Sequence, residues 1–304
     1  MSEGRIADIF DIEGRFLRSA HLERDFYDSA ALAGYVVTGF ARSSLSRIGE
    51  GLKPNSGQRA WRITGHYGAG KSSFALLLAH LLAGREANLP PQIRSVTELG
   101  RRPPSFLPIL VTCARQPLSA SILKALHLAA TKVYGRTTKV KLAGEIKRLV
   151  SSTSEPADSH ILDLITRLNT QLIVDSKGKG LVLILDELGK LLEFAGLHPG
   201  RQDVFLLQRL AEAASRSGDE PMFIVSLLHQ GFSAYADHLD QSTEREWEKI
   251  AGRFEEIVFD QPIGQIAELI SREIQRRTRR DHQKTQQLLW SLEGVKDTIK
   301  NPVQ

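Results

Sequence analysis

One segment, residues 65–72, constrains the fold of this chain more than any other part of its sequence. It reads GHYGAGKS and matches the pattern G-x-x-x-x-G-K-[ST] in full. In this pattern, glycines let backbone N–H groups turn inward around phosphate groups, and the N-terminus of the following helix adds positive potential. The motif requires a strand before it and a helix after it. The alternative is a glycine-rich turn that binds no ligand.

The residues on either side of this segment provide the required context. Residues 60–64 (AWRIT) are typical of a strand, and residues 72–82 are typical of an apolar helix. We therefore expect Lys71 to reach the β- and γ-phosphates of ATP, and the hydroxyl of Ser72 to bind Mg²⁺. The residues predicted to bind the nucleotide are Gly65, His66, Tyr67, Gly68, Ala69, Gly70, Lys71, Ser72 and Ser73.

Two adjacent carboxylates follow the uninterrupted apolar run at residues 181–185 (LVLIL). Such a run is typical of a strand covered on both faces, and open parallel sheets bind ligands at the C-terminal ends of their strands. We expect Asp186 to hold hydrated Mg²⁺, and Glu187 to orient or deprotonate the water that attacks the γ-phosphate. The alternative is that Asp186 caps the next helix and Glu187 is a solvated acid in its first turn.

Strands and helices alternate through the middle of the chain. This alternation predicts an α/β fold: a P-loop NTPase with a mostly parallel five-stranded sheet flanked by helices. From residue 262 onward the sequence is typical of helix only, and the family resemblance given below implies that this part is a partial helical lid. The polar stretch at residues 134–159 is interpreted as an exposed excursion with a short helical run. Further strands are expected at residues 107–112, 222–227 and 256–259, and further helices after a Ser119 cap, at 161–174 and at 203–214.

Length and composition limit the class of protein. The 304 residues allow about two domains, and we divide them into a helical lead-in (1–34), an ATPase domain (35–261) and a helical lid or the start of a truncated C-terminal region (262–304). A single cysteine excludes an internal disulfide and multi-cysteine metal sites. Because no apolar run approaches the ~18 residues of a membrane span and the first residues lack a secretory signal, we predict a cytoplasmic protein without membrane contact.

Polar residues near the end of the strand expected at 222–227 are candidates for a phosphate sensor. This strand is expected to lie between the two strands that carry the motifs. Ser226, His229 and Gln230 are the candidates to contact the γ-phosphate or the attacking water, and each is equally compatible with an ordinary strand-end cap.

Arg253 stands just before the last expected strand. An arginine at a subunit edge can enter the ATP site of a neighbouring subunit and stabilise charge in the transition state. The alternative for Arg253 is a surface ion pair with Glu255 or Glu256.

With these residues in place, the chain resembles the AAA+ branch of P-loop ATPases. Gly252-Arg253-Phe254 before a strand is similar to the arginine-finger segment of that superfamily, and residues 262–280 are similar to the start of its helical lid. The order of residues 35–38 (YVVT), 65–72, 185–189 (LDELG) and 249–254 (KIAGRF) resembles that in the large bacterial phage-defence ATPases of the BREX type. The resemblance covers residues 35–270, and its general ATPase motifs are more specific than the subfamily features.

This resemblance implies an ATPase with catalytic roles for Lys71, Glu187 and Arg253. It also implies a homo-oligomer with the arginine finger supplied in trans, and protein partners in a defence system. The sequence departs from the family in its short length and in lacking a clear asparagine at the sensor position. A lid arginine cannot be assigned, with Arg272, Arg276 and Arg277 as the candidates.

A basic cluster at residues 272–284 leaves nucleic-acid binding open. Arginines in this cluster suit contacts with DNA or RNA phosphates, and the alternative is cations near a helix C-terminus or on a solvated face. The sequence thus predicts an ATP-hydrolysing switch or motor in anti-phage defence. The alternative is a nucleotide-gated DNA-binding or signalling scaffold with little turnover.

Overall fold

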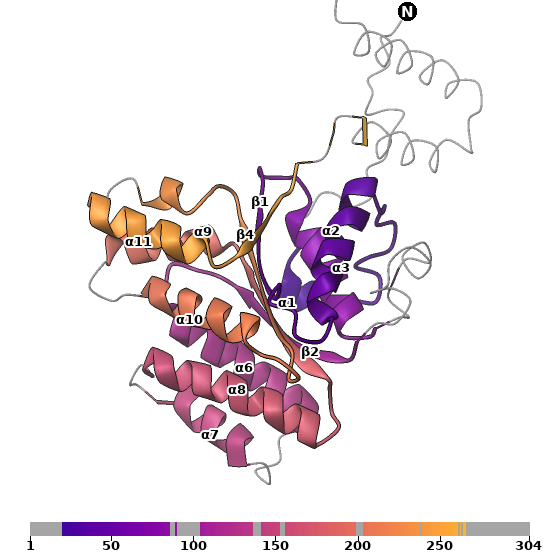
Figure 1. Ribbon diagram of the computed structural model, residues 1–304. Helices are drawn as coiled ribbons and strands as arrows, with labels where there is room; N and C mark the ends of the chain where they lie inside the picture. Colours follow the sequence, from indigo (N-terminus) through magenta and orange to yellow (C-terminus); the bar gives the residue numbers. More distant parts are fainter. Residues whose placement is uncertain are drawn as a thin grey trace, which may run out of the picture. The chain divides into compact units, whose positions relative to one another are not determined.

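A five-stranded parallel sheet organises the chain (Figure 1). Its strands follow the order β2-β3-β4-β1-β5, and every neighbouring pair is parallel. The predicted α/β fold is thereby confirmed, and β4 lies between β1 and β3 as expected. The strands are β1 (Ala60–Thr64), β2 (Phe106–Thr112), β3 (Gly180–Asp186), β4 (Met222–Leu228) and β5 (Glu255–Val258).

The structure is a computed structural model that describes residues 20–85, 89, 104–135, 141–152, 156–198, 203–236, 239–260, 262, 264 and 265. Residues Ala20–Asp260 form one compact unit. The lid arginine candidates and the basic cluster at 272–284 lie outside the described residues. Residues 20–34, set apart above as part of a lead-in, contribute Leu22, Phe26 and Leu32 to the same hydrophobic cluster as β1.

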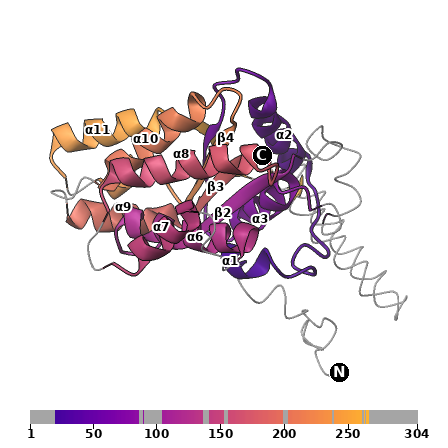
Figure 2. The same ribbon diagram turned by 90° about the horizontal axis from the view of Figure 1, so that it is seen from below.

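Helices cover both faces of the sheet (Figures 1 and 2). Successive strand residues point to opposite faces, so Trp61 and Ile63 pack against one helical layer while Leu183 and Leu185 pack against the other. One layer holds α1 (Leu22–Asp25), α2 (Gly39–Gly49) and α3 (Lys71–Leu82). The other holds α6 (Leu118–Tyr134), α7 (Lys141–Val150), α8 (Asp158–Val174), α9 (Leu188–Leu197), α10 (Asp203–Ser215) and α11 (Gln241–Ala251). Two 3₁₀ turns, η3 (Glu50–Leu52) and η6 (Ser233–Tyr235), complete the described elements.

Two local predictions need correction. The helix expected after a Ser119 cap begins at Leu118 with Pro117 at the N-cap, and Ser119 is buried inside α6. Proline has a fixed φ that suits the start of a helix, so it takes this position without a side-chain cap. Residues 141–150 are also not an exposed excursion, because Leu142 and Ile146 are buried in the core on one face of α7.

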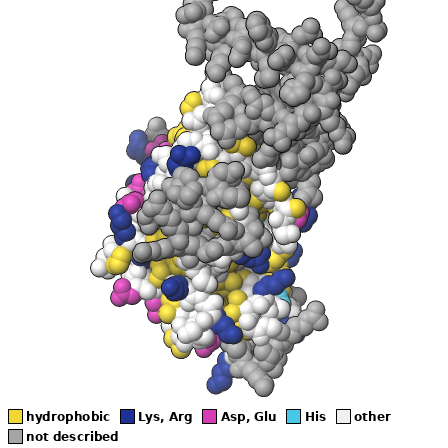
Figure 3. Space-filling view, turned by 90° about the vertical axis from the view of Figure 1, so that its right-hand side faces the viewer, with side chains coloured by type: hydrophobic (Ala, Val, Ile, Leu, Met, Phe, Trp, Pro, Cys, Tyr) yellow, Lys and Arg dark blue, Asp and Glu magenta, His cyan; other side chains and the backbone are white. Residues whose placement is uncertain are grey.

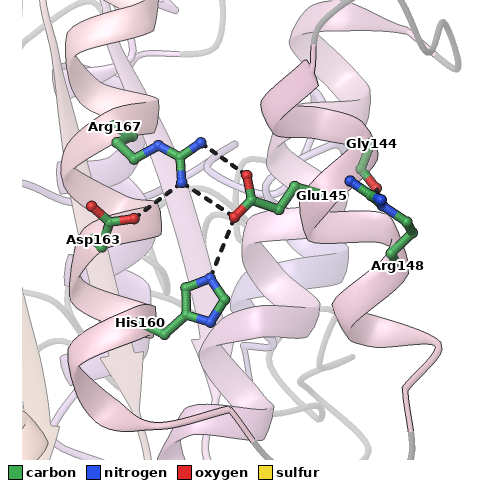
Figure 4. A network of polar contacts seen from close by, with 6 residues as sticks. All are labelled: Gly144, Glu145, Arg148, His160, Asp163 and Arg167. Atoms are coloured by element: carbon green, nitrogen blue, oxygen red, sulfur yellow. Dashed lines mark hydrogen bonds and ion pairs between the residues drawn. The ribbon is translucent and has the colours of Figure 1, made fainter.

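A polar network fixes α7 to α8 (Figure 4). Arg167 of α8 donates hydrogen bonds of 3.2 and 2.8 Å to the two carboxylate oxygens of Glu145 on α7, and a third of 3.0 Å to Asp163. The ring of His160 lies 3.3 Å from the same Glu145. These contacts lower the pKa of Glu145, chiefly through the Arg167 hydrogen bond. The network explains why a basic, polar segment packs as a helix.

The surface carries its cations in a dispersed pattern on the face drawn in Figure 3. Over the described part of that face, Lys and Arg side chains are scattered among hydrophobic and acidic ones rather than gathered in one patch. Among the described residues, no helix combines the length and apolarity that crossing a membrane requires.

A buried arginine ties two loops to the start of β1. Arg59 is 1% exposed, and its guanidinium donates to the carbonyls of Gly51 (2.9 Å), Gly218 (2.8 Å) and Lys53 (3.3 Å) and to the Ser217 hydroxyl (2.9 Å). One side chain therefore satisfies several acceptors in the interior.

Replacing Arg59 by methionine should lower the free energy of unfolding by about 2–4 kcal/mol, because buried acceptors that lose their donor cost about 1–3 kcal/mol each. Urea denaturation followed by circular dichroism measures the change. Arg216→Met is the matched control, since Arg216 is exposed on the surface, and it should change stability by no more than about 0.5 kcal/mol. An equal loss of stability in Arg59→Met and Arg216→Met would contradict the structural role of Arg59.

Candidate nucleotide-binding site

The loop at residues 65–70 joins β1 to α3, as the motif requires. Gly68 and Gly70 have φ values of 77° and 93°, which residues with a Cβ atom rarely adopt. A Cβ added at Gly65 would lie 2.5 Å from the carbonyl oxygen of Phe259. Gly70 stands at the N-cap of α3 without a side-chain cap, so the first N–H groups of this helix retain their capacity to bind an anion.

Lys71 lies beneath this loop, with its ammonium turned toward backbone oxygens. The side chain donates to the carbonyls of Gly65 and His66, the latter at 2.7 Å, and Nζ lies 3.4 Å from Nδ1 of His229. Burial lowers the pKa of Lys71, and the nearby Asp186 carboxylate partly offsets this effect. A cation in this position is suited to an anionic ligand that the loop would enclose.

Ser72 and Asp186 bring a hydroxyl and a carboxylate together at the ends of α3 and β3. The carboxylate of Asp186 accepts a hydrogen bond from the Ser72 side chain and another of 2.8 Å from the backbone N–H of Glu187. Asp186 is 5% exposed, and this burial raises its pKa. Mg²⁺ is usually held by one or two such oxygen ligands together with substrate phosphates and water.

These two residues fit that mode of binding. Among the described residues there is also no cluster of three His, Cys, Asp or Glu side chains that would hold a metal ion without a substrate.

Glu187 adopts an uncommon backbone conformation, with φ of 54° at the junction of β3 and α9. It occupies the N-cap of α9, but its side chain does not cap the helix and instead forms an ion pair with Lys190. Asp186 is therefore not the cap of this helix, as the alternative proposed above would require. Left-handed residues other than glycine cost about 1–3 kcal/mol and cluster at functional sites.

The structure separates the three sensor candidates. Ser226 is completely buried inside β4, and its hydroxyl lies 3.3 Å from the carbonyl oxygen of Trp61 in β1, so it does not stand at the strand end. His229 follows β4 directly and stacks on Tyr67 with ring centroids 3.4 Å apart. Burial and the Lys71 charge lower the pKa of His229. Of the three, His229 is the residue in contact with Lys71.

A cavity of about 130 Å³ opens beside these residues. It brings together Glu187, His229 and Gln230 with residues that the sequence analysis did not single out. The spacing of Lys190, three residues after Glu187, was a signal for one of them. Nothing in the local sequence marks Tyr235. The lining residues are Tyr67, Glu187, Gly189, Lys190, Glu193, His229, Gln230 and Tyr235.

Arg253 lies between α11 and β5 and does not line this cavity. Its Nε is 3.5 Å from Glu212 of α10, and its side chain is 52% exposed. The alternative that Arg253 forms an ion pair with Glu255 or Glu256 is therefore wrong, because Arg253 pairs with Glu212. Glu256 instead accepts hydrogen bonds from Arg62 (2.9 Å) and Thr64 (3.0 Å) across the β1–β5 pair.

Comparisons with known proteins add little. No model of a known protein family matches this sequence, and no curated protein matches it. Two solved structures of the Aeropyrum pernix ORC2 protein are similar. Its ADPNP and ADP complexes give a TM-score of 0.47 at 15% identity, covering 87% of this chain and 55% of that chain. Its ADP form gives a TM-score of 0.45 at 14% identity, covering 80% and 52%. This chain spans about half the length of those proteins, and at this level of similarity neither structure bears on function.

Proposed function

We propose that this chain is an AAA+-like module that binds and hydrolyses ATP. One observation carries the proposal: the glycine loop with Lys71, the Ser72–Asp186 contact and Glu187 meet at the C-terminal ends of β1 and β3. Open parallel sheets bind ligands at this edge.

Each of these residues has a role in the proposed reaction. Lys71 exchanges the carbonyls of the loop for oxygens of the β- and γ-phosphates. Ser72 and Asp186 hold Mg²⁺, which when bound neutralises charge on the phosphates. Glu187 orients the water and takes its proton as the water oxygen bonds to the γ-phosphorus and the bond to the ADP oxygen breaks.

The test uses the full chain. Calorimetric titration with MgATP should show saturable binding, and a phosphate-release assay should show turnover. A titration without heat, together with no protection against thermal unfolding by MgATP, contradicts the proposal. Binding with an ATP-dependent change in oligomeric state but negligible phosphate release favours the alternative, a nucleotide-gated DNA-binding or signalling scaffold.

We also propose an oligomer in which Arg253 of one subunit completes the site of the next. Its half-exposed side chain at the end of α11 and its absence from the cavity of its own chain support this arrangement. The order of the motifs along the chain is the support for a switch or motor in bacterial anti-phage defence. Protein partners of such a system belong to the same proposal.

Mixing two inactive variants tests the trans arrangement. Arg253→Ala and Glu187→Gln should each lose turnover alone, but together they should recover part of it, because some mixed interfaces pair an intact Glu187 with an intact Arg253. Phosphate release is measured across mixing ratios at constant total protein. Recovery at no ratio, with mixed oligomers verified by sizing, would contradict a role in trans.

A further inference from the structure

Lys190 lies in the first turn of α9 and contacts Glu187, the residue that we assign as the base. Its ammonium forms an ion pair with the Glu187 carboxylate, and the two side chains are 52% and 36% exposed. Glu187 is thus directed along α9 rather than toward Lys71, whose own contacts are with Gly65, His66 and His229.

The backbone next to Lys190 is closely packed by Tyr235, another residue that lines the cavity. A Cβ added at Gly189 would lie 2.3 Å from the hydroxyl of Tyr235, so only glycine permits this close approach. The Tyr235 hydroxyl in turn is hydrogen-bonded to the backbone of His229 and Gln230. The first turn of α9 therefore packs closely against a tyrosine that is hydrogen-bonded to the chain just after β4.

A second carboxylate in the cavity, that of Glu193, is already paired with an arginine. Glu193, three residues after Lys190, accepts hydrogen bonds of 3.0 and 2.7 Å from Arg115. Arg115 thereby neutralises the carboxylate that would compete with Glu187 for the Lys190 ammonium.

From this arrangement we infer that Lys190 is a positioning residue that holds the Glu187 carboxylate along α9 and so lowers the rate of turnover. The inference rests on the proposed ATP hydrolysis and adds a regulatory residue to that site.

Steady-state kinetics of Lys190 variants test the restraint. Lys190→Met should raise kcat about two- to fivefold, the range expected for loss of a partly exposed ion pair, with KM unchanged. Lys190→Arg should keep the low wild-type kcat. Lys249→Met is the matched control, because Lys249 forms the same kind of i,i+3 pair with Glu246 on α11 away from the cavity, so kcat should not change. An unchanged or lower kcat in Lys190→Met, with MgATP still bound, overturns the inference.

A second measurement needs no turnover. The Glu187 hydrogen bond raises the pKa of Lys190, so an amine-reactive reagent should label Lys190 faster in Glu187→Gln than in the wild type, with Lys249 as the internal reference. Equal labelling in both proteins shows that the ion pair is not formed and overturns the inference. Failure of the wild type to bind MgATP, with the labelling difference present, counts against the proposed function but not against the contact.

Discussion

Glu187→Gln should lower steady-state ATP hydrolysis by about 10²- to 10⁴-fold, the contribution of a positioned general base, while MgATP still binds. Glutamine keeps the size of the side chain and its preference for the backbone, so the left-handed turn at the start of α9 is retained. What it loses is the ability to accept a proton from water. Phosphate release measures the first effect and calorimetric titration measures the second.

Glu193→Gln is the matched control for this experiment. Glu193 lines the same cavity, but its carboxylate accepts hydrogen bonds from Arg115. Its loss should leave turnover within about twofold of the wild type, because a surface ion pair contributes little. Turnover at the wild-type rate in Glu187→Gln, or an equal loss in both variants, shows that Glu187 is not the base.

The strands and the phosphate loop were predictable because their determinants are local. An apolar run such as residues 181–185 forms a central strand wherever both faces are covered, and all seven residues of β3 are buried. The loop itself needs Gly68 and Gly70, because its backbone has positive φ values at both positions. The N-cap of α2 is equally local: the side chain of Thr38 accepts a hydrogen bond from the backbone N–H of Ala41, three residues later.

The contacts between side chains of the site were less predictable than the strands. His229 meets Tyr67 and Lys71 because β4 lies between β3 and β1. The sequence made His229 one of three candidates, but it did not identify which of them contacts Lys71. The choice between Ser226 and His229 depends on where β4 ends and on which face each residue points to, and a shift of one residue reverses that face.

The sequence analysis did not locate two helices, α9 and α11. α9 follows β3 with only Glu187 between them, so no polar loop marks its start, and the sequence analysis considered a helix there only as an alternative, without bounds. α11 does carry a signal that was not used. Asp240 caps it by accepting from the backbone N–H groups of Ser242 and Thr243.

Lys71→Met should weaken MgATP binding by about 10- to 150-fold, which is the loss of a charge-assisted hydrogen bond of about 1.5–3 kcal/mol. Methionine keeps the unbranched shape that fits under the loop but carries no charge. The fold should survive, because burial already disfavours the Lys71 cation and the loop conformation is supplied by Gly68 and Gly70. Calorimetry gives the affinity directly.

Thermal unfolding with and without MgATP provides a second readout of the Lys71 variant. A ligand that binds only the folded state raises the midpoint by an amount that grows with the ratio of its concentration to Kd, so at the same nucleotide concentration the shift should be large in the wild type and small in Lys71→Met. Lys124→Met is the control, because Lys124 is exposed on α6, and it should keep the full shift. If Lys71→Met binds MgATP as tightly as the wild type does, the ammonium beneath the loop does not contact phosphate. The glycine loop would then be a turn without a ligand, and the assignments of Ser72, Asp186 and Glu187 would lose their common support.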